Sequence, residues 1–190
     1  MKNKFLLLLL GLLFYSNFAV FAQTTSNKGT DFWVPYAGHI DGLVSRMTLF
    51  LSSDVNTSYR VISDNKTIAS GSIIANVVTP VFIDPNEHKV YIATSNVKEI
   101  NKGINVSSTA PISVYCVISN NARTGATLVL PTPSLEQEYY VFSQQNKGNT
   151  NNAAYSQFTV VAVKDGTNVE ITPTQTDKDG ARTANAAFQV

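Results

Sequence analysis

The sequence has few of the residues that most often carry chemistry. Its 190 residues include one cysteine and two histidines, and only 14% are charged, against about 25% in an average globular domain. A lone cysteine cannot form an internal disulfide, and zinc sites are built from Cys and His clusters. Cys116 lies in an apolar run, where it is expected to pack as a small buried hydrophobe. We therefore predict no metal and no cofactor, and a fold stabilised by its core.

An excess of charge of either sign is also missing. Lys and Arg number 14 and Asp and Glu number 13. Nucleic-acid binding usually requires a basic stripe, and attachment to an anionic membrane requires a basic cluster. Neither pattern is present, so the sequence predicts no nucleic-acid partner.

Enzyme signatures are absent as well. The chain contains no G-x-S-x-G elbow and no glycine-rich phosphate loop. Residues 54–58 and 177–180 resemble pieces of calcium loops, but each supplies fewer oxygens than calcium requires. His39, Asp41 and Ser45 are close in sequence, yet catalytic triads are assembled in space. The sequence predicts that the protein is not an enzyme.

Only one long hydrophobic run occurs, and it lies at the N-terminus. Phe5–Phe14 follows Lys2 and Lys4 and precedes the small-residue site Val20–Ala22. A run of about ten residues is too short to cross a bilayer, which needs about twenty. These features predict a cleaved signal peptide at residues 1–22, a mature chain starting at Gln23, and no membrane span after cleavage. The expected location is secreted or cell-surface.

The rest of the chain has the pattern of a β-protein. Turn signals recur roughly every 8–12 residues, and no long stretch keeps a helical period. The predicted class is an all-β antiparallel sandwich. The predicted strands are Gly29–Val34, Arg46–Ser53, Ser58–Ser63, Thr67–Ala75, Val77–Ile83, Lys89–Thr94, Ile112–Ser119, Ala126–Leu130, Glu138–Gln144, Gln157–Lys164, Thr167–Thr172 and Ala184–Val190, with a short helical turn at Leu135–Glu138.

A weak internal repeat predicts two related units. Asp31–Val34 resembles Glu138–Val141, and each is followed by a loop and two strands about an Asp-led turn. In the second copy that turn is Asp165-Gly166, a strong hairpin signal. The predicted division is a first sandwich unit at 23–134 and the start of a second, truncated unit at 135–190. Further domains are expected beyond Val190.

Five blocks in order resemble the N-terminal domain of the IgGFc-binding protein family. They are GTDFWV, KGINVSSTAPISVY, ATLVLP, LEQEYYV and VKDGTNVEITP, at 29–34, 102–115, 126–131, 135–141 and 163–173. The resemblance implies an extracellular β-domain that acts in binding or adhesion, without established catalysis. The short signal and single cysteine favour the branch found in bacterial surface proteins. Fc binding itself is not carried over, because no block is a known Fc-contact motif.

Aromatic residues are the candidate binding side chains, since rings with polar handles are common at interfaces. The alternative for each is a place in the core. The binding candidates are Trp33, Tyr36, Tyr139, Tyr140 and Tyr155, and the candidate binding loops are Pro35–Leu43, Asn120–Gly125 and Asn146–Asn152.

These observations favour an exported, non-catalytic binding or adhesion module whose partner is an extracellular protein or a glycan. Two alternatives remain open. One is a structural spacer that presents downstream domains. The other is a glycan-acting hydrolase, for which Glu136 and Glu138 are the nearest pair of carboxylates in the sequence.

Overall fold

The structure is a computed structural model that describes residues 26–39, 44–92, 98–121, 123–142 and 156–190. The predicted signal peptide, Tyr155 and the loop Asn146–Asn152 lie outside the described residues.

Seven strands form one hydrogen-bonded sheet, and all the paired neighbours are antiparallel. The prediction of an antiparallel all-β fold is confirmed. The strands are β1 (Gly29–Val34), β2 (Arg46–Ser52), β3 (Thr57–Ser63), β4 (Lys66–Ile73), β5 (Thr79–Ile83), β6 (Ile104–Ser119) and β7 (Thr124–Val129).

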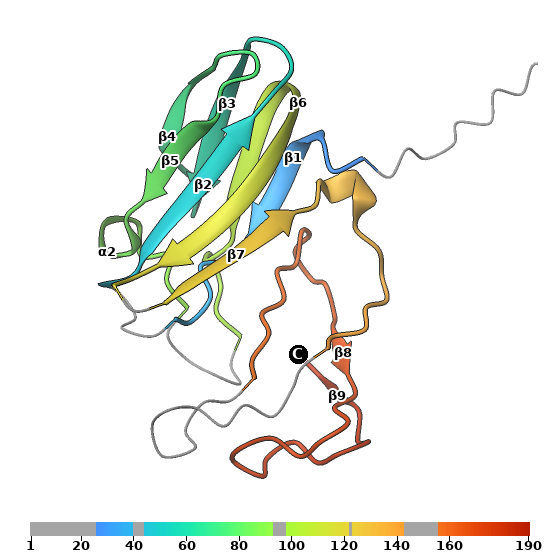
Figure 1. The fold of residues 1–190 in the computed structure, drawn as a ribbon. Coiled ribbons are helices and arrows are strands. Elements are labelled where there is room, and N and C mark those ends of the chain that lie inside the picture. Colours follow the sequence, from blue (N-terminus) through green and yellow to red (C-terminus); the bar gives the residue numbers. More distant parts are fainter. Residues whose placement is uncertain (1–25, 40–43, 93–97, 122, 143–155) are drawn as a thin grey trace, which may run out of the picture.

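The long strand β6 folds this sheet into two layers (Figure 1). Its first half, Ile104–Ser108, pairs with β1 and β3, and β4 completes a four-stranded layer that we call the first sheet. Its second half, Ser113–Ser119, pairs with β2 and β7, and β5 completes the second sheet. The two layers make the predicted sandwich, with β6 in both.

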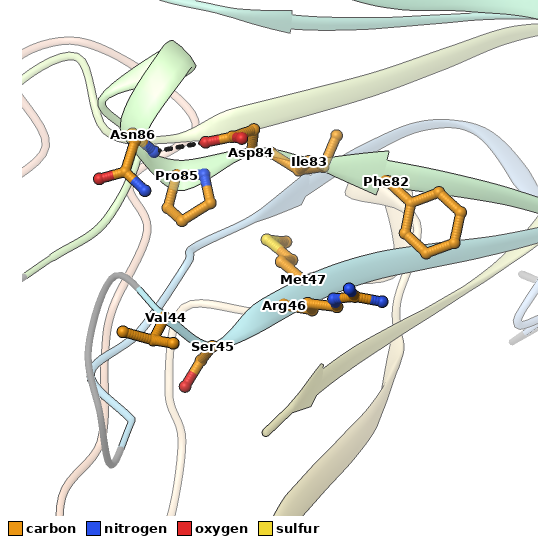
Figure 2. Close-up of a pocket in the computed structure, with 9 residues that line it drawn as sticks. All are labelled: Val44, Ser45, Arg46, Met47, Phe82, Ile83, Asp84, Pro85 and Asn86. Atoms are coloured by element: carbon orange, nitrogen blue, oxygen red, sulfur yellow. Dashed lines mark hydrogen bonds between the residues drawn. The ribbon is translucent and has the colours of Figure 1, made fainter. Parts of the chain in front are cut away.

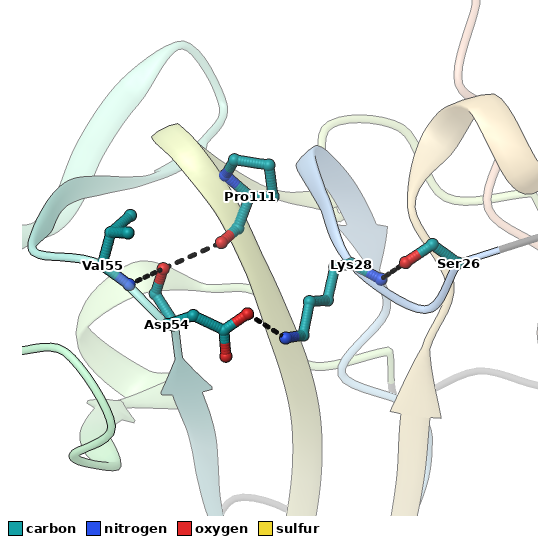
Figure 3. Close-up of polar contacts among 6 residues, drawn as sticks. Ser26, Lys28, Asp54, Val55 and Pro111 are labelled. Carbon is teal, nitrogen blue, oxygen red and sulfur yellow. Dashed lines mark hydrogen bonds and ion pairs between the residues drawn. The ribbon is translucent and has the colours of Figure 1, made fainter. Parts of the chain in front are cut away.

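Side-chain bonds support the turn of β6 between the two sheets. The Ser53 hydroxyl donates to the carbonyl oxygen of Pro111 at 2.9 Å, in the stretch where β6 changes sheet. Nearby, the Lys28 ammonium group pairs with the Asp54 carboxylate and ties the start of β1 to the β2–β3 turn (Figure 3). Polar side chains thus satisfy backbone groups where strand pairing is interrupted.

The core lies between the two sheets. Alternate residues along each strand point inward, as the pleat of a strand requires, so Met47, Leu49 and Leu51 of β2 are fully buried. The fully buried residues contributed by the other strands include Phe32, Val61, Ile73, Ile104, Val106, Ile112 and Val114.

Beyond β7 the described chain holds little regular structure, and several predicted strands are not formed. It contains the 3-10 turn η2 (Thr132–Ser134) and one two-stranded sheet of β8 (Glu170–Ile171) with β9 (Phe188–Gln189). Asp165-Gly166 is a turn, with Gly166 at φ +73°, but the segments that flank it do not pair.

The corrections have physical causes. The predicted strands Gln157–Lys164 and Glu138–Gln144 form no strand over their described parts, because β-propensity without a partner strand does not make a sheet. The described part of the predicted strand Lys89–Thr94, residues 89–92, supplies a bridge from Tyr91 to Tyr36 and no strand, and the helical turn predicted at Leu135–Glu138 is absent. The two-unit organisation stays a prediction.

Candidate functional site

The outer face of the second sheet carries a band of aromatic and apolar side chains. Phe50 on β2 is paired with Pro80 on β5 and with Tyr115 on β6, and Tyr115 is paired with Leu128 on β7. These four residues therefore form one row across all four strands. We call this surface the aromatic face, defined by Phe50, Pro80, Phe82, Tyr115, Val117 and Leu128.

Phe82 and Val117 belong to the next row, on either side of Thr48. The exposed fraction is 67% for Phe82 and 45% for Tyr115, so both rings are open to solvent. Arg46, at one end of β2, is the only charged residue at an outward position on these four strands. The aromatic face is thus uncharged over most of its area.

The first sheet has a different outer face. Outward positions there include the polar or charged residues Ser58, Arg60, Ser70, Asn105 and Ser107, and the partly buried Trp33 and Ile62 flank Asn105. The two sheets share one core and one strand. The contrast between their outer faces is therefore a local feature and not an effect of the overall composition. Large exposed apolar patches on soluble proteins usually mark interaction sites.

A shallow pocket lies at the Arg46 end of the aromatic face (Figure 2). Arg46 and Phe82 both line it, and so does Asp84, which caps the one-turn helix α2 (Pro85–His88). The Asp84 carboxylate accepts hydrogen bonds from the backbone N–H groups of Glu87 and Asn86, and these bonds lower its pKa. The Asp84 carboxylate thus caps the N-terminus of α2, and no ion pair joins it to Arg46 among the described residues.

Two of the predicted binding aromatics, Tyr36 and Trp33, are fully or partly buried. Tyr36 is fully buried; its hydroxyl donates to the carbonyl oxygen of Ser45, and its ring meets the Tyr91 ring edge-on at 5.5 Å. Burial, together with nearby Tyr91, raises the pKa of Tyr36 to about 12. Trp33 is half-buried and its ring lies over Gly103.

Two others are exposed on the irregular chain after β7. Tyr139 accepts a hydrogen bond from the backbone N–H of Glu136, and Tyr140 donates to the Glu138 carboxylate at 3.1 Å. These two residues are adjacent in the chain, and the structure does not join them to Trp33 or Tyr36 in one surface. The binding role of the five predicted residues stays a prediction.

Among the predicted loops, the described part of Pro35–Leu43 holds the polar contact that most resembles catalytic chemistry. His39 Nδ1 lies 2.8 Å from the Ser45 hydroxyl. Ser45 is only 2% exposed, so its hydroxyl lacks the access that a nucleophile needs. Across the described ranges, no group of three or more His, Cys, Asp or Glu side chains gathers in a way that could hold a metal ion.

Sequence reasoning missed the aromatic face, although a signal for it was present. The runs LFL at 49–51 and VYCVI at 114–118 are apolar at consecutive positions, whereas a strand with one solvated face alternates. Apolar residues on both sides of a strand require a cover over both faces. The described chain covers only the inner one.

Comparisons with known proteins found a family model that matches part of the chain, and no individual relative. A search of curated proteins and a search of solved structures found no match. Over the described residues, no helix combines the length and apolar character needed to cross a membrane. Residues 125–190, which begin in β7 and include Tyr139 and Tyr140, match the model of a family described as IgGFc binding protein.

Proposed function

We propose that this protein is an exported, non-catalytic binding or adhesion module, secreted or held at the cell surface, that recognises an extracellular protein through its aromatic face. The observation that carries the proposal is the uncharged aromatic face on one sheet of the sandwich. The match of residues 125–190 to a family described as a binding protein supports the same class of function.

The composition of the aromatic face suits a protein interface. Interface cores are enriched in aromatic side chains and depleted of charge, and a polar rim surrounds them. Phe82 and Tyr115 supply the rings, and Ser52 and Ser119 lie at the ends of β2 and β6. Four strands about 4.8 Å apart give the face an area of about 300 Å², which is within the range of functional patches on monomers.

Nothing in the geometry favours the glycan-hydrolase alternative. That reaction needs two carboxylates on either side of a bound sugar. The Glu138 carboxylate is instead hydrogen-bonded by Tyr140, and both Glu136 and Glu138 lie on an exposed, irregular segment.

The test is a binding screen of the purified protein against arrays of extracellular proteins, immunoglobulin among them, and of glycans. For any protein that binds, we expect the double variant Phe82→Ser/Tyr115→Ser to weaken binding by at least about tenfold, the usual effect of removing interface anchors. The matched control is Phe142→Ser/Phe158→Ser, which removes two exposed rings elsewhere and should leave the affinity unchanged.

The other outcomes are as informative. Loss of binding only in the control variant would move the site to the chain after β7. Binding to glycans alone would reject the protein partner. Failure to bind anything on either array would favour the structural spacer.

A further inference from the structure

Among the described residues, β1, β4, β5 and β7 of the seven-stranded sheet each pair with one strand only, and β1 has in addition the bridge from Phe32 to Pro131. Free edges invite pairing with other chains, and proteins block them with charges, prolines or bulges. Three of these edges are blocked in that way. β1 carries Asp31 and an irregular register, β4 begins with Lys66 and pairs irregularly with β3, and β5 contains Pro80.

The β7 edge has none of these features. Thr124–Val129 contains no charged residue and no proline. It pairs with β6 through six consecutive residues without a register shift. Five of its six residues are exposed, and a Cβ atom added at Gly125 would meet nothing within 4 Å. The edge is therefore straight and accessible to another backbone (Figure 1).

An apolar groove runs beside this edge. Gly125 and Thr127 form one wall, and Cys116 and Ile118 of β6 lie next to them. The opposite wall is Pro35 and Ala37, which follow β1. No charged residue lines the groove, so a strand that adds to β7 would also cover apolar surface.

We propose that β7 pairs antiparallel with β7 of a second copy of this chain. The free backbone N–H and C=O groups of an edge strand are spaced to hydrogen-bond with another strand, so the partner is expected to be a strand. An antiparallel pair of identical strands is self-complementary, so one two-fold contact satisfies both edges and closes the assembly at a dimer. The absence of charge on Thr124–Val129 removes the repulsion that normally prevents such pairing.

The accessible length sets the centre of the pairing. Beyond Val129 the chain meets β1 through the bridge of Pro131 to Phe32, so the open stretch runs from Thr124 to Leu128. Ala126 is its midpoint and faces its own equivalent across the two-fold axis. The two second sheets become one eight-stranded sheet, with both aromatic faces on the same side.

The test is sedimentation equilibrium of the purified protein from low micromolar to near-millimolar concentration. We expect a monomer–dimer equilibrium that Ala126→Lys weakens by at least about tenfold, because two like charges would lie opposite each other. Ser72→Lys is the control: Ser72 is exposed on the edge strand β4 and is paired with the uncharged Ser58, so its substitution should leave the monomer–dimer equilibrium unchanged. Circular dichroism would verify that both variants keep the β-fold.

A second variant tests which residues lie opposite each other in the dimer. Directly paired residues of antiparallel strands have Cα atoms about 4.5–5.5 Å apart, which suits a disulfide. Under mild oxidation Ala126→Cys should form a covalent dimer, and Ser72→Cys should not. A monomer at every concentration without crosslinking would overturn the proposal. So would a dimer that survives Ala126→Lys but is lost in Phe82→Ser/Tyr115→Ser, since that dimer would form through the aromatic face.

Discussion

Tyr36 and Trp33 show how two nearby aromatic residues take different places in the fold. The strand alternates, so Phe32 and Val34 point into the core and Trp33 points outward. Tyr36 follows the same alternation and is buried, with its hydroxyl bonded to Ser45. The sequence predicts the alternation. It does not say which side faces the core, because that depends on which strands lie alongside.

Cys116 provides a prediction about alkaline pH. Burial raises the pKa of its thiol from 9.0 to about 12. Between these values the unfolded chain has lost the proton that the folded chain keeps, so the thiol's contribution to stability is complete below pH 9 and declines as pH rises towards 12. Tyr36, with its raised pKa, contributes in the same direction at higher pH.

We expect Cys116→Val to reduce this loss. Urea unfolding at about pH 8 and about pH 10.5 should show that the wild type loses about 2 kcal/mol more than the variant, since one pKa unit corresponds to about 1.4 kcal/mol. Equal losses in the two proteins would mean that the thiol titrates normally in the folded chain. Valine suits the comparison because it is a small apolar side chain without a titrating group.

At the scale of the element, the contact of β1 with the chain after β7 depends on a glycine. A Cβ atom at Gly29 would lie 2.4 Å from Cβ of Pro131, closer than two carbon atoms can approach. The backbone of β1 must therefore shift to accept any side chain there. Asp31 joins the same parts by accepting a hydrogen bond from Thr132 at 2.5 Å, and it also accepts one from Asn105 of β6 at 2.7 Å.

Gly29→Ala is expected to destabilise the protein by about 1–3 kcal/mol, the usual cost of overpacking. The measurement is the midpoint of urea unfolding at neutral pH. Gly125→Ala is the control, because the added methyl group meets nothing within 4 Å. If both variants lose stability equally, the contact with Pro131 is not the cause of the loss.

Strand positions in the first part of the chain were largely predictable. Arg46–Ser53, Ser58–Ser63 and Ala126–Leu130 were predicted within one or two residues of β2, β3 and β7. The first half of β6 was not predicted, although Ile104 and Val106 alternate with polar residues. Ser107, Ser108 and Pro111 precede the predicted strand Ile112–Ser119, and β6 continues through them from one sheet to the other.

At the scale of the whole molecule, regular structure is unevenly distributed. Strands β1–β7 share one core, while residues 156–190 contribute only β8 and β9. Val160 and Phe158 in this later part are exposed. Local β-propensity predicts strands here. A strand forms only where a partner strand pairs with it, and propensity carries no information about that partner.

Limited proteolysis should reflect this difference. Lys164, Lys178 and Arg182 lie on chain with little strand pairing, so trypsin should cut there at least about tenfold faster than within β1–β7, where cleavage requires unfolding of the sheet. Mass spectrometry of the digest would identify the order of the cuts. A resistant fragment that ends after β7 would support the predicted division near residue 134, whereas simultaneous loss of all parts would contradict it.

The shared strand β6 has a mechanical consequence. A force that pulls the chain apart cannot separate the two layers of the sandwich one after the other, because both are hydrogen-bonded to the same sixteen-residue strand. Single-molecule extension of this region should therefore show one rupture event in place of two. In a domain that carries a load between cells or surfaces, such a strand makes both layers resist the force together.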